Sequence, residues 1–307
     1  MPNYSKELSL ATELVKSAAK ITEWFRKKGF ESYQKQNRSP VTLADFASQI
    51  FIISKLKTTF PQDQLIAEED DSTFIDENAE RAINECYKTL GLRRIENFKR
   101  ILNYRGVDSN RQWTIDPIDG TKGFLKNLSY TIGIGFMIDS DPKFSSIAAP
   151  NYNEKSLAVF SAEKGKGAKV SYNDDKFSII KVSCQKVLKN AGICRSLHHD
   201  QPWTLKFAKI AEITKNIQMD GMGKFCIIAD GSFDILIRPE RIITNSWDYM
   251  PGDLIVREAG GRVSDLNGNP LRYEYNKCLL TSPGIIASNG LLHEESLKII
   301  KDNKLYD

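Results

Sequence analysis

The chain has 307 residues, of which 41% are hydrophobic and 27% are charged, a balance that excludes a disordered or fibrous protein. The net charge of +4 gives no whole-molecule case for binding a nucleic acid polymer or a membrane. No apolar run approaches the ~20 residues of a transmembrane helix. The five scattered cysteines form neither a disulfide framework nor a zinc motif, so we expect reduced thiols and a cytoplasmic location.

Helical signals dominate the start of the chain. Apolar residues recur at helical spacing over 5–28, which predicts an amphipathic helix. A second helix is expected from near Asp45 until Phe60-Pro61 stops it, and a strand at 65–67 follows. Residues 71–110 are polar and helix-prone, and we interpret them as an inserted, partly mobile segment.

Strand signals dominate the middle of the chain. We expect a strand at 113–115 that Pro117 ends, and the later strands are predicted at 131–138, 146–149 and 157–161. The turn at 163–168 marks the expected boundary between an α+β domain at 1–165 and an α/β domain at 166–307. The second domain alternates predicted strands with predicted helices, as βαβ units do. These strands are 179–182, 192–194, 225–229 and 233–237, and these helices are 203–214 and 248–258.

Acidic residues stand where predicted strands end and predicted helices begin. They are Asp45, Glu68, Glu69, Asp116, Asp119 and Asp248. Carboxylates gathered in one cleft repel each other, and a divalent cation relieves that repulsion. Because paired His or Cys ligands are missing from these motifs, the oxygen donors favour a hard ion such as Mg²⁺ over zinc.

The sequence Asp-Pro-Ile-Asp-Gly-Thr-Lys-Gly-Phe, which begins at Asp116, is the most informative stretch. Its turn can aim Asp116 and Asp119 at one site, with the Ile118 carbonyl between them. Gly120 lets a ligand approach the backbone closely. Thr121 is placed to cap a helix whose free N–H groups would hold a phosphate. One loop thus offers metal ligands beside a phosphate cradle, which metal-assisted hydrolysis of a phosphate ester requires.

The order of these motifs resembles the lithium-sensitive, magnesium-dependent phosphatases of the inositol monophosphatase superfamily, from about residue 8 to about residue 290. The motifs are Asp45, Glu68-Glu69, the Asp116–Thr121 loop, Trp247-Asp248 and Glu258-Ala-Gly-Gly261. Lys122-Gly123-Phe124 and the long stretch 70–115 resemble the 3'(2'),5'-bisphosphate nucleotidase branch. The resemblance implies a layered αβαβα sandwich of the sugar phosphatase type.

The resemblance also implies a set of metal ligands for two to three Mg²⁺ ions. Glu68, Asp116 and the Ile118 carbonyl would hold one ion. Asp116, Asp119 and Asp248 would hold a second, and Glu68 would help with a third, looser ion.

Proton transfer and substrate binding are implied in the same way. Asp45 and the Thr121 hydroxyl would take the proton from the attacking water, since a hydroxyl alone is too weak a base. Lys224 and Arg238 would hold the phosphate that is not cleaved, and Gly221 stands where the family pattern has Ser. The implied substrate contacts are Gly120, Thr121, His199, Gly221, Lys224, Arg238 and Asp248.

We therefore expect Mg²⁺-dependent hydrolysis of a small phosphate ester, with adenosine 3',5'-bisphosphate giving AMP and phosphate. An inositol polyphosphate 1-phosphatase is the alternative within the same superfamily. An inactive ligand-binding sensor on this fold is the non-enzymatic alternative, and the filled acidic positions argue against it. The chain is expected to be a monomer.

Overall fold

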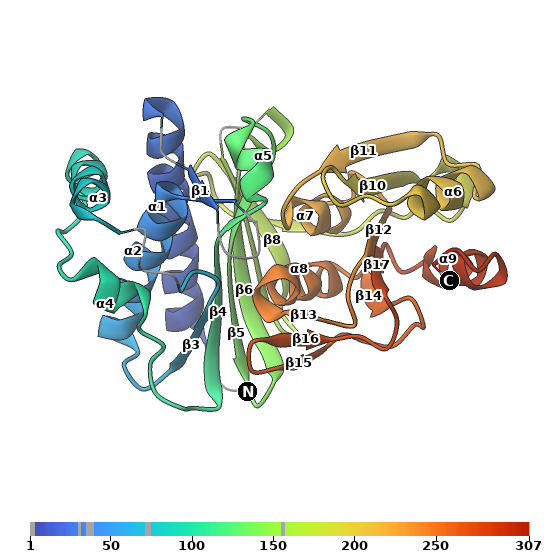
Figure 1. The fold of residues 1–307 in the computed structure, drawn as a ribbon. Helices are drawn as coiled ribbons and strands as arrows, with labels where there is room; N and C mark the ends of the chain where they lie inside the picture. Colours follow the sequence, from blue (N-terminus) through green and yellow to red (C-terminus); the bar gives the residue numbers. More distant parts are fainter. Residues whose placement is uncertain (1–3, 30–31, 35–39, 71–74, 155–156, 307) are drawn as a thin grey trace.

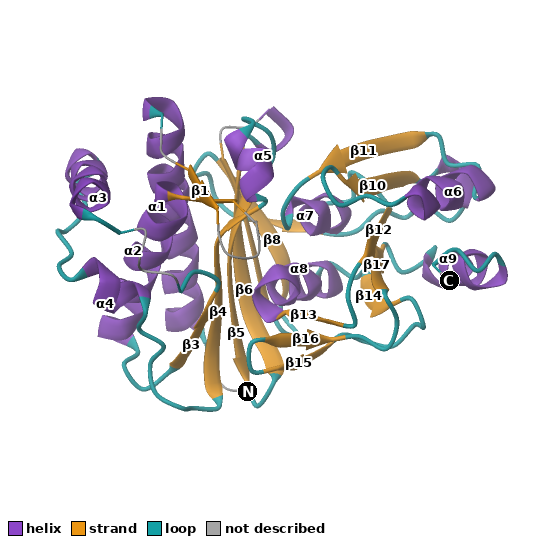
Figure 2. Cartoon of the chain, in the orientation of Figure 1, coloured by secondary structure: helices purple, strands orange, loops and turns teal. Residues whose placement is uncertain are grey.

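The computed structural model describes residues 4–29, 32–34, 40–70, 75–154 and 157–306. Within them, helices and sheets alternate in five layers: helices, a large sheet, helices, a smaller sheet and helices (Figure 1). In Figure 2 the two sheets stand on either side of the central helical layer. The predicted αβαβα sandwich is therefore confirmed.

The large sheet has seven strands among the described residues, in the order β3-β4-β5-β6-β7-β8-β9. Strands β3 and β4 run parallel. The other neighbouring pairs are antiparallel. Helices cover both faces, so β5 and β6 are buried along most of their length. The strands are β3 (Gln64–Ala67), β4 (Arg111–Asp119), β5 (Thr131–Ile138), β6 (Asp141–Pro150), β7 (Leu157–Glu163), β8 (Gly167–Tyr172) and β9 (Ser178–Ile180).

Helices α1 (Ser5–Lys28) and α2 (Leu43–Thr59) cover the outer face of this sheet. α1 is amphipathic, as its spacing predicted, and it buries Leu14, Val15 and Phe25. α2 is buried on nearly every side because α3 (Glu77–Thr89) and α4 (Phe98–Leu102) pack against it. These last two helices form in the predicted helix-prone stretch, of which 71–74 lie outside the described residues.

The smaller sheet has five strands, in the order β11-β10-β12-β17-β14. α7 (Gly223–Ala229) and α8 (Ser246–Glu258) lie between the two sheets, and α6 (Pro202–Ile210) and α9 (His293–Asp302) cover its outer face (Figure 1). The strands are β10 (Gly192–Ser196), β11 (Lys215–Met219), β12 (Ile235–Pro239), β14 (Arg262–Asp265) and β17 (Gly284–Ser288).

The remaining elements are short. β1 (Ser32–Gln34) pairs with β2 (Pro40–Thr42), and α5 (Thr121–Leu125) follows β4. A three-stranded sheet contains β13 (Ile243–Asn245), β16 (Lys277–Leu279) and β15 (Arg272–Glu274). No helix in the described part of the chain is long and apolar enough to cross a bilayer.

Two predictions about the positions of strands are wrong. The run Phe225–Ala229, predicted as a strand, forms most of α7. The helix is buried on all sides between the two sheets, so its apolar run has no helical periodicity to read. Pro117 does not end its strand, because β4 continues through a register shift to Asp119.

The predicted domain boundary at 165/166 lies in the turn between β7 and β8. Both strands belong to the large sheet, which continues to β9. The division into two domains stays a prediction.

We expect the buried side chain of His293 to make the free energy of unfolding depend on pH. Its ring is fully buried, with each nitrogen 2.9 Å from a hydroxyl, that of Ser264 or of Ser288. Burial, followed by the charge of Arg262, lowers its pKa from 6.5 to about 4. The unfolded chain therefore binds the extra proton, so stability is present above pH 6.5 and is lost as the pH falls toward 4.

The expected loss from this one group is about 3 kcal/mol of unfolding free energy. Urea unfolding between pH 7.5 and 4.5 measures it. The variant His293→Gln, which cannot be protonated, should lose less stability over this range. Parallel curves for the two proteins would contradict the prediction.

Candidate active site

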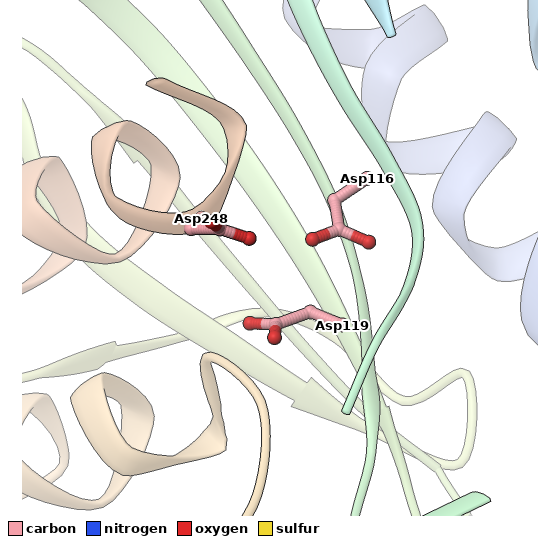
Figure 3. A group of neighbouring side chains, drawn as sticks. All are labelled: Asp116, Asp119 and Asp248. Atoms are coloured by element: carbon pink, nitrogen blue, oxygen red, sulfur yellow. The ribbon is translucent and has the colours of Figure 1, made fainter. Parts of the chain in front are cut away.

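Three aspartates meet where the large sheet faces the central helical layer. Asp116 and Asp119 lie in the last part of β4, and Asp248 lies in the first turn of α8. One carboxylate oxygen from each residue lies within 4.8 Å of the other two. Figure 3 shows the three side chains pointing toward a common centre. The fold thus joins acidic residues from opposite halves of the chain.

The irregularity in β4 explains how two of them share a site. Residues three apart in a regular strand point to opposite faces. Here the pairing with β5 shifts between Asp116 and Asp119, at Pro117, which cannot donate to the ladder. The bulge turns both carboxylates toward α8.

Glycines let α8 and α7 lie close to the large sheet. A Cβ atom at Gly135 would meet Met250 Cε at 2.3 Å, and one at Gly133 would meet Met222 Cε at 2.2 Å. Ser145 on β6 also donates a hydrogen bond of 3.0 Å to the carbonyl of Pro251 in α8. This close packing brings the start of α8, and with it Asp248, against β4.

Burial and mutual repulsion raise the pKa values of all three carboxyls. Burial raises the pKa of Asp116 far above its ordinary value, and the charges of Glu68, Asp119 and Asp248 add to the shift. Burial also raises the pKa of Asp248 to about 8 and that of Asp119 to about 6. Asp119 shifts less because Lys224 and Arg238 counteract burial.

These residues fit a hard divalent cation. Both carboxylate oxygens of Asp116 and Oδ2 of Asp119 are buried without a hydrogen-bond partner in the described part of the chain. Buried carboxylates that lack donors are costly unless a cation satisfies them. Glu68 lies near these aspartates, and its charge adds to the repulsion on Asp116. The all-oxygen donor set favours Mg²⁺ over zinc.

Side chains of helix α2 hold the two backbone segments that carry acidic residues, one at Glu69 and one at Pro117. Ser48 Oγ donates to the carbonyl of Pro117 at 3.2 Å. The Gln49 amide bonds both backbone groups of Glu69, accepting from its N–H at 2.9 Å and donating to its carbonyl at 2.5 Å. Asp45 is fully buried in the capping box of α2, where its Oδ2 accepts hydrogen bonds from the N–H and the hydroxyl of Thr42.

Thr121 does not cap α5 as predicted. It is the first residue of the helix, and the N-cap position is Gly120, whose φ of 94° places it in the left-handed region. The Thr121 hydroxyl donates to the carbonyl of Ile118 at 3.3 Å rather than to Asp45. The predicted proton-transfer pair of Thr121 and Asp45 therefore stays a prediction.

A cavity of about 350 Å³ opens beside the three aspartates. Acidic residues line it together with the cations Lys122, Lys224 and Arg238. Lys224 is 2% exposed, and its Nζ donates to the carbonyl of Gly221 at 2.6 Å. The cavity lining is Glu68, Asp119, Gly120, Thr121, Lys122, Ser196, His198, His199, Asp220, Gly221, Lys224, Arg238 and Asp248. It contains every predicted substrate contact.

His198 also lines this cavity, although only His199 was predicted from the sequence to contact the substrate. Its Nδ1 lies 2.5 Å from Asp220 Oδ2, and its Nε2 lies 3.0 Å from Lys126 Nζ. A Lys donor requires the neutral ring nitrogen as acceptor, so the proton sits on Nδ1 and is donated to Asp220. The sequence signal that could have indicated His198 is its position two residues after Ser196, the last residue of β10.

Gly221 is required by its surroundings. Its φ is +67°, and a Cβ atom there would meet the carbonyl oxygen of Asp119 at 2.4 Å and Thr131 Oγ1 at 2.7 Å. The Ser that the family pattern has at this position does not fit this backbone. The loop that carries Gly221 can therefore lie directly against the Asp119 backbone.

We expect Gly221→Ala to lower the free energy of unfolding by at least about 2 kcal/mol, because a backbone atom must move. Urea unfolding measures the change. Gly165→Ala is the matched control, since Gly165 has a φ of +76° with nothing within 4 Å of the added Cβ. Equal losses in both variants would assign the effect to backbone conformation alone.

The fold and site define a layered α/β protein whose cavity combines clustered carboxylates with cationic side chains. The profile of the inositol monophosphatase family matches residues 3–305. The chain therefore belongs to the inositol monophosphatase family of phosphatases.

Curated relatives and solved structures agree with this assignment. A 3'(2'),5'-bisphosphate nucleotidase of Schizosaccharomyces pombe is 32% identical, with 96% of this chain and 95% of that protein covered. One from Emericella nidulans is 29% identical, with 97% and 98% covered. An IMPase of Thermotoga maritima has the same fold, with a TM-score of 0.71 at 22% identity over 98% of this chain and 99% of that one.

Proposed function

We propose that this chain is a Mg²⁺-dependent phosphomonoesterase that hydrolyses adenosine 3',5'-bisphosphate to AMP and phosphate. One observation carries the proposal: Asp119, whose Oδ2 is buried without a hydrogen-bond partner among the described residues, lines the same cavity as the buried cation Lys224. Carboxylates suit metal ions at the phosphate that is cleaved, and cations suit a second phosphate that is kept. The nucleotidase names of the curated relatives support this substrate.

Asp116, Asp119 and Asp248 would hold the Mg²⁺ ions, with Glu68 and the Ile118 carbonyl completing the donor set. When bound, the ions would lower the pKa of a water and neutralise charge on the phosphate. The chain's own contribution is to hold these carboxylates close together and partly shielded from bulk water.

The remaining residues bind and orient the ester. The N–H groups at the start of α5, beside Gly120, would donate hydrogen bonds to the phosphate that is cleaved, and Lys224 and Arg238 would pair with the second phosphate. His199 would contact the sugar or the base, since it lines the same cavity. Asp45, buried behind the site, would receive the water proton through the Thr121 hydroxyl.

Phosphate release from adenosine 3',5'-bisphosphate and from inositol 1,4-bisphosphate tests the proposal. Purified protein with MgCl₂ should cleave the nucleotide at the higher kcat/KM, and excess EDTA should stop the reaction. A faster rate on the inositol ester would favour the polyphosphate phosphatase. Binding of the nucleotide without turnover of either compound would favour the inactive sensor.

A further inference from the structure

Two hydroxyls at the start of β5 hold the loop of Asp220, Gly221 and Met222, one just before the strand and one on its first residue. Ser129 Oγ, just before β5, accepts the N–H of Asp220 at 2.8 Å. Thr131 Oγ1, the first residue of β5, accepts the N–H of Met222 at 2.9 Å. Thr131 and Met222 are both buried, at 1% and 0% exposed, so this hydrogen bond is shielded from water.

The same loop sets the position of the Lys224 ammonium. The carbonyl of Gly221, between the two anchored N–H groups, accepts a hydrogen bond of 2.6 Å from Lys224 Nζ. Lys224 is 2% exposed and reaches the cavity from the first turn of α7. Any shift of the loop therefore moves the ammonium.

Thr131 also lies beside the acidic residues of β4. Its Cα pairs with that of Asp119 in the ladder between β4 and β5. Gly221 packs so closely that an added Cβ would lie 2.4 Å from the Asp119 carbonyl and 2.7 Å from Thr131 Oγ1. Thr131 thus contacts both β4, which carries Asp119, and the loop whose carbonyl binds the Lys224 ammonium.

We propose that Thr131, supported by Ser129, is a positioning residue that fixes the spacing between the carboxylates and the Lys224 ammonium. It thereby selects esters that carry a second anionic group at a set distance from the phosphate that is cleaved. This inference rests on the proposed function, because it concerns how the same site recognises its substrate.

The test compares two substrates that differ in one phosphate, adenosine 3',5'-bisphosphate and adenosine 3'-monophosphate. Thr131→Val keeps the shape of the side chain but removes the acceptor for the Met222 N–H. We expect KM for the bisphosphate to rise about tenfold with kcat within about twofold, while kcat/KM for the monophosphate stays within about twofold. Thr131→Ser, which restores the hydroxyl, should recover most of the bisphosphate KM.

The control is Ser146→Ala, which removes a buried hydroxyl from the same sheet that bonds Thr12 at 2.9 Å and does not contact the loop. It should leave both substrates unchanged. Equal losses on both substrates, or no loss on either, with Thr131→Val would overturn the inference. If that variant does not fold, Ser129→Ala must show the same selective rise in KM. A wild-type protein that hydrolyses neither nucleotide would overturn the proposed function itself, and this inference with it.

Discussion

Replacing Asp116 by Asn should lower kcat/KM in MgCl₂ on the order of 1,000-fold while raising the melting temperature of the metal-free protein. Activity falls because Asn removes a charged ligand from the centre of the acidic site. Stability rises because Asp116 is buried among Glu68, Asp119 and Asp248, and the amide removes one repelling carboxylate. Phosphate release and thermal melts in EDTA and in MgCl₂ measure the two effects.

The pH dependence of this stability gain provides a second check. Because the folded pKa of these carboxyls is raised, the folded metal-free protein binds protons that the unfolded chain has released. Stability from the protonated form is therefore lost as the pH rises, and the advantage of Asn over Asp should grow from pH 5 to pH 8.5. An advantage that shrinks over this range, or full activity in the variant, would contradict the assignment of Asp116.

Replacing Lys224 by Met should raise KM for adenosine 3',5'-bisphosphate about 100-fold, with a much smaller effect on adenosine 3'-monophosphate. The ammonium is almost fully buried, so its interaction with a second phosphate is poorly screened by water. Burial first, and then the charge of Arg238, lowers the pKa of Lys224. An anionic ligand beside the ammonium would stabilise its charged form against both burial and the charge of Arg238. Initial-rate kinetics with the two substrates measure the difference.

Lys122→Met is the matched control, because Lys122 lines the same cavity but is exposed. We expect it to change KM by no more than a few-fold, as exposed charges contribute little. Comparable effects of the two substitutions would show that general positive charge at the cavity, and not the buried ammonium, selects the substrate.

Local sequence patterns predicted an amphipathic helix and a continuous apolar strand. The spacing of residues 5–28 predicted α1, and the apolar run at 131–138 predicted β5 with its observed bounds. The same reasoning was wrong for Phe225–Ala229, since a helix enclosed between two sheets has no polar face. Pro117 was misjudged because a bulge lets a proline remain within a strand.

The sequence by itself determined that acidic residues distant along the chain form one candidate site, because their types and order limit the possible chemistry. It also indicated where the cations of that site lie. Only the tertiary structure decided that the hydroxyls of Ser129 and Thr131 hold the Gly221 loop and that Gly221 leaves no room for Ser. The physical reason is that these effects depend on distances of a few ångströms between β5 and a loop some 90 residues later, and a linear pattern carries no record of such contacts.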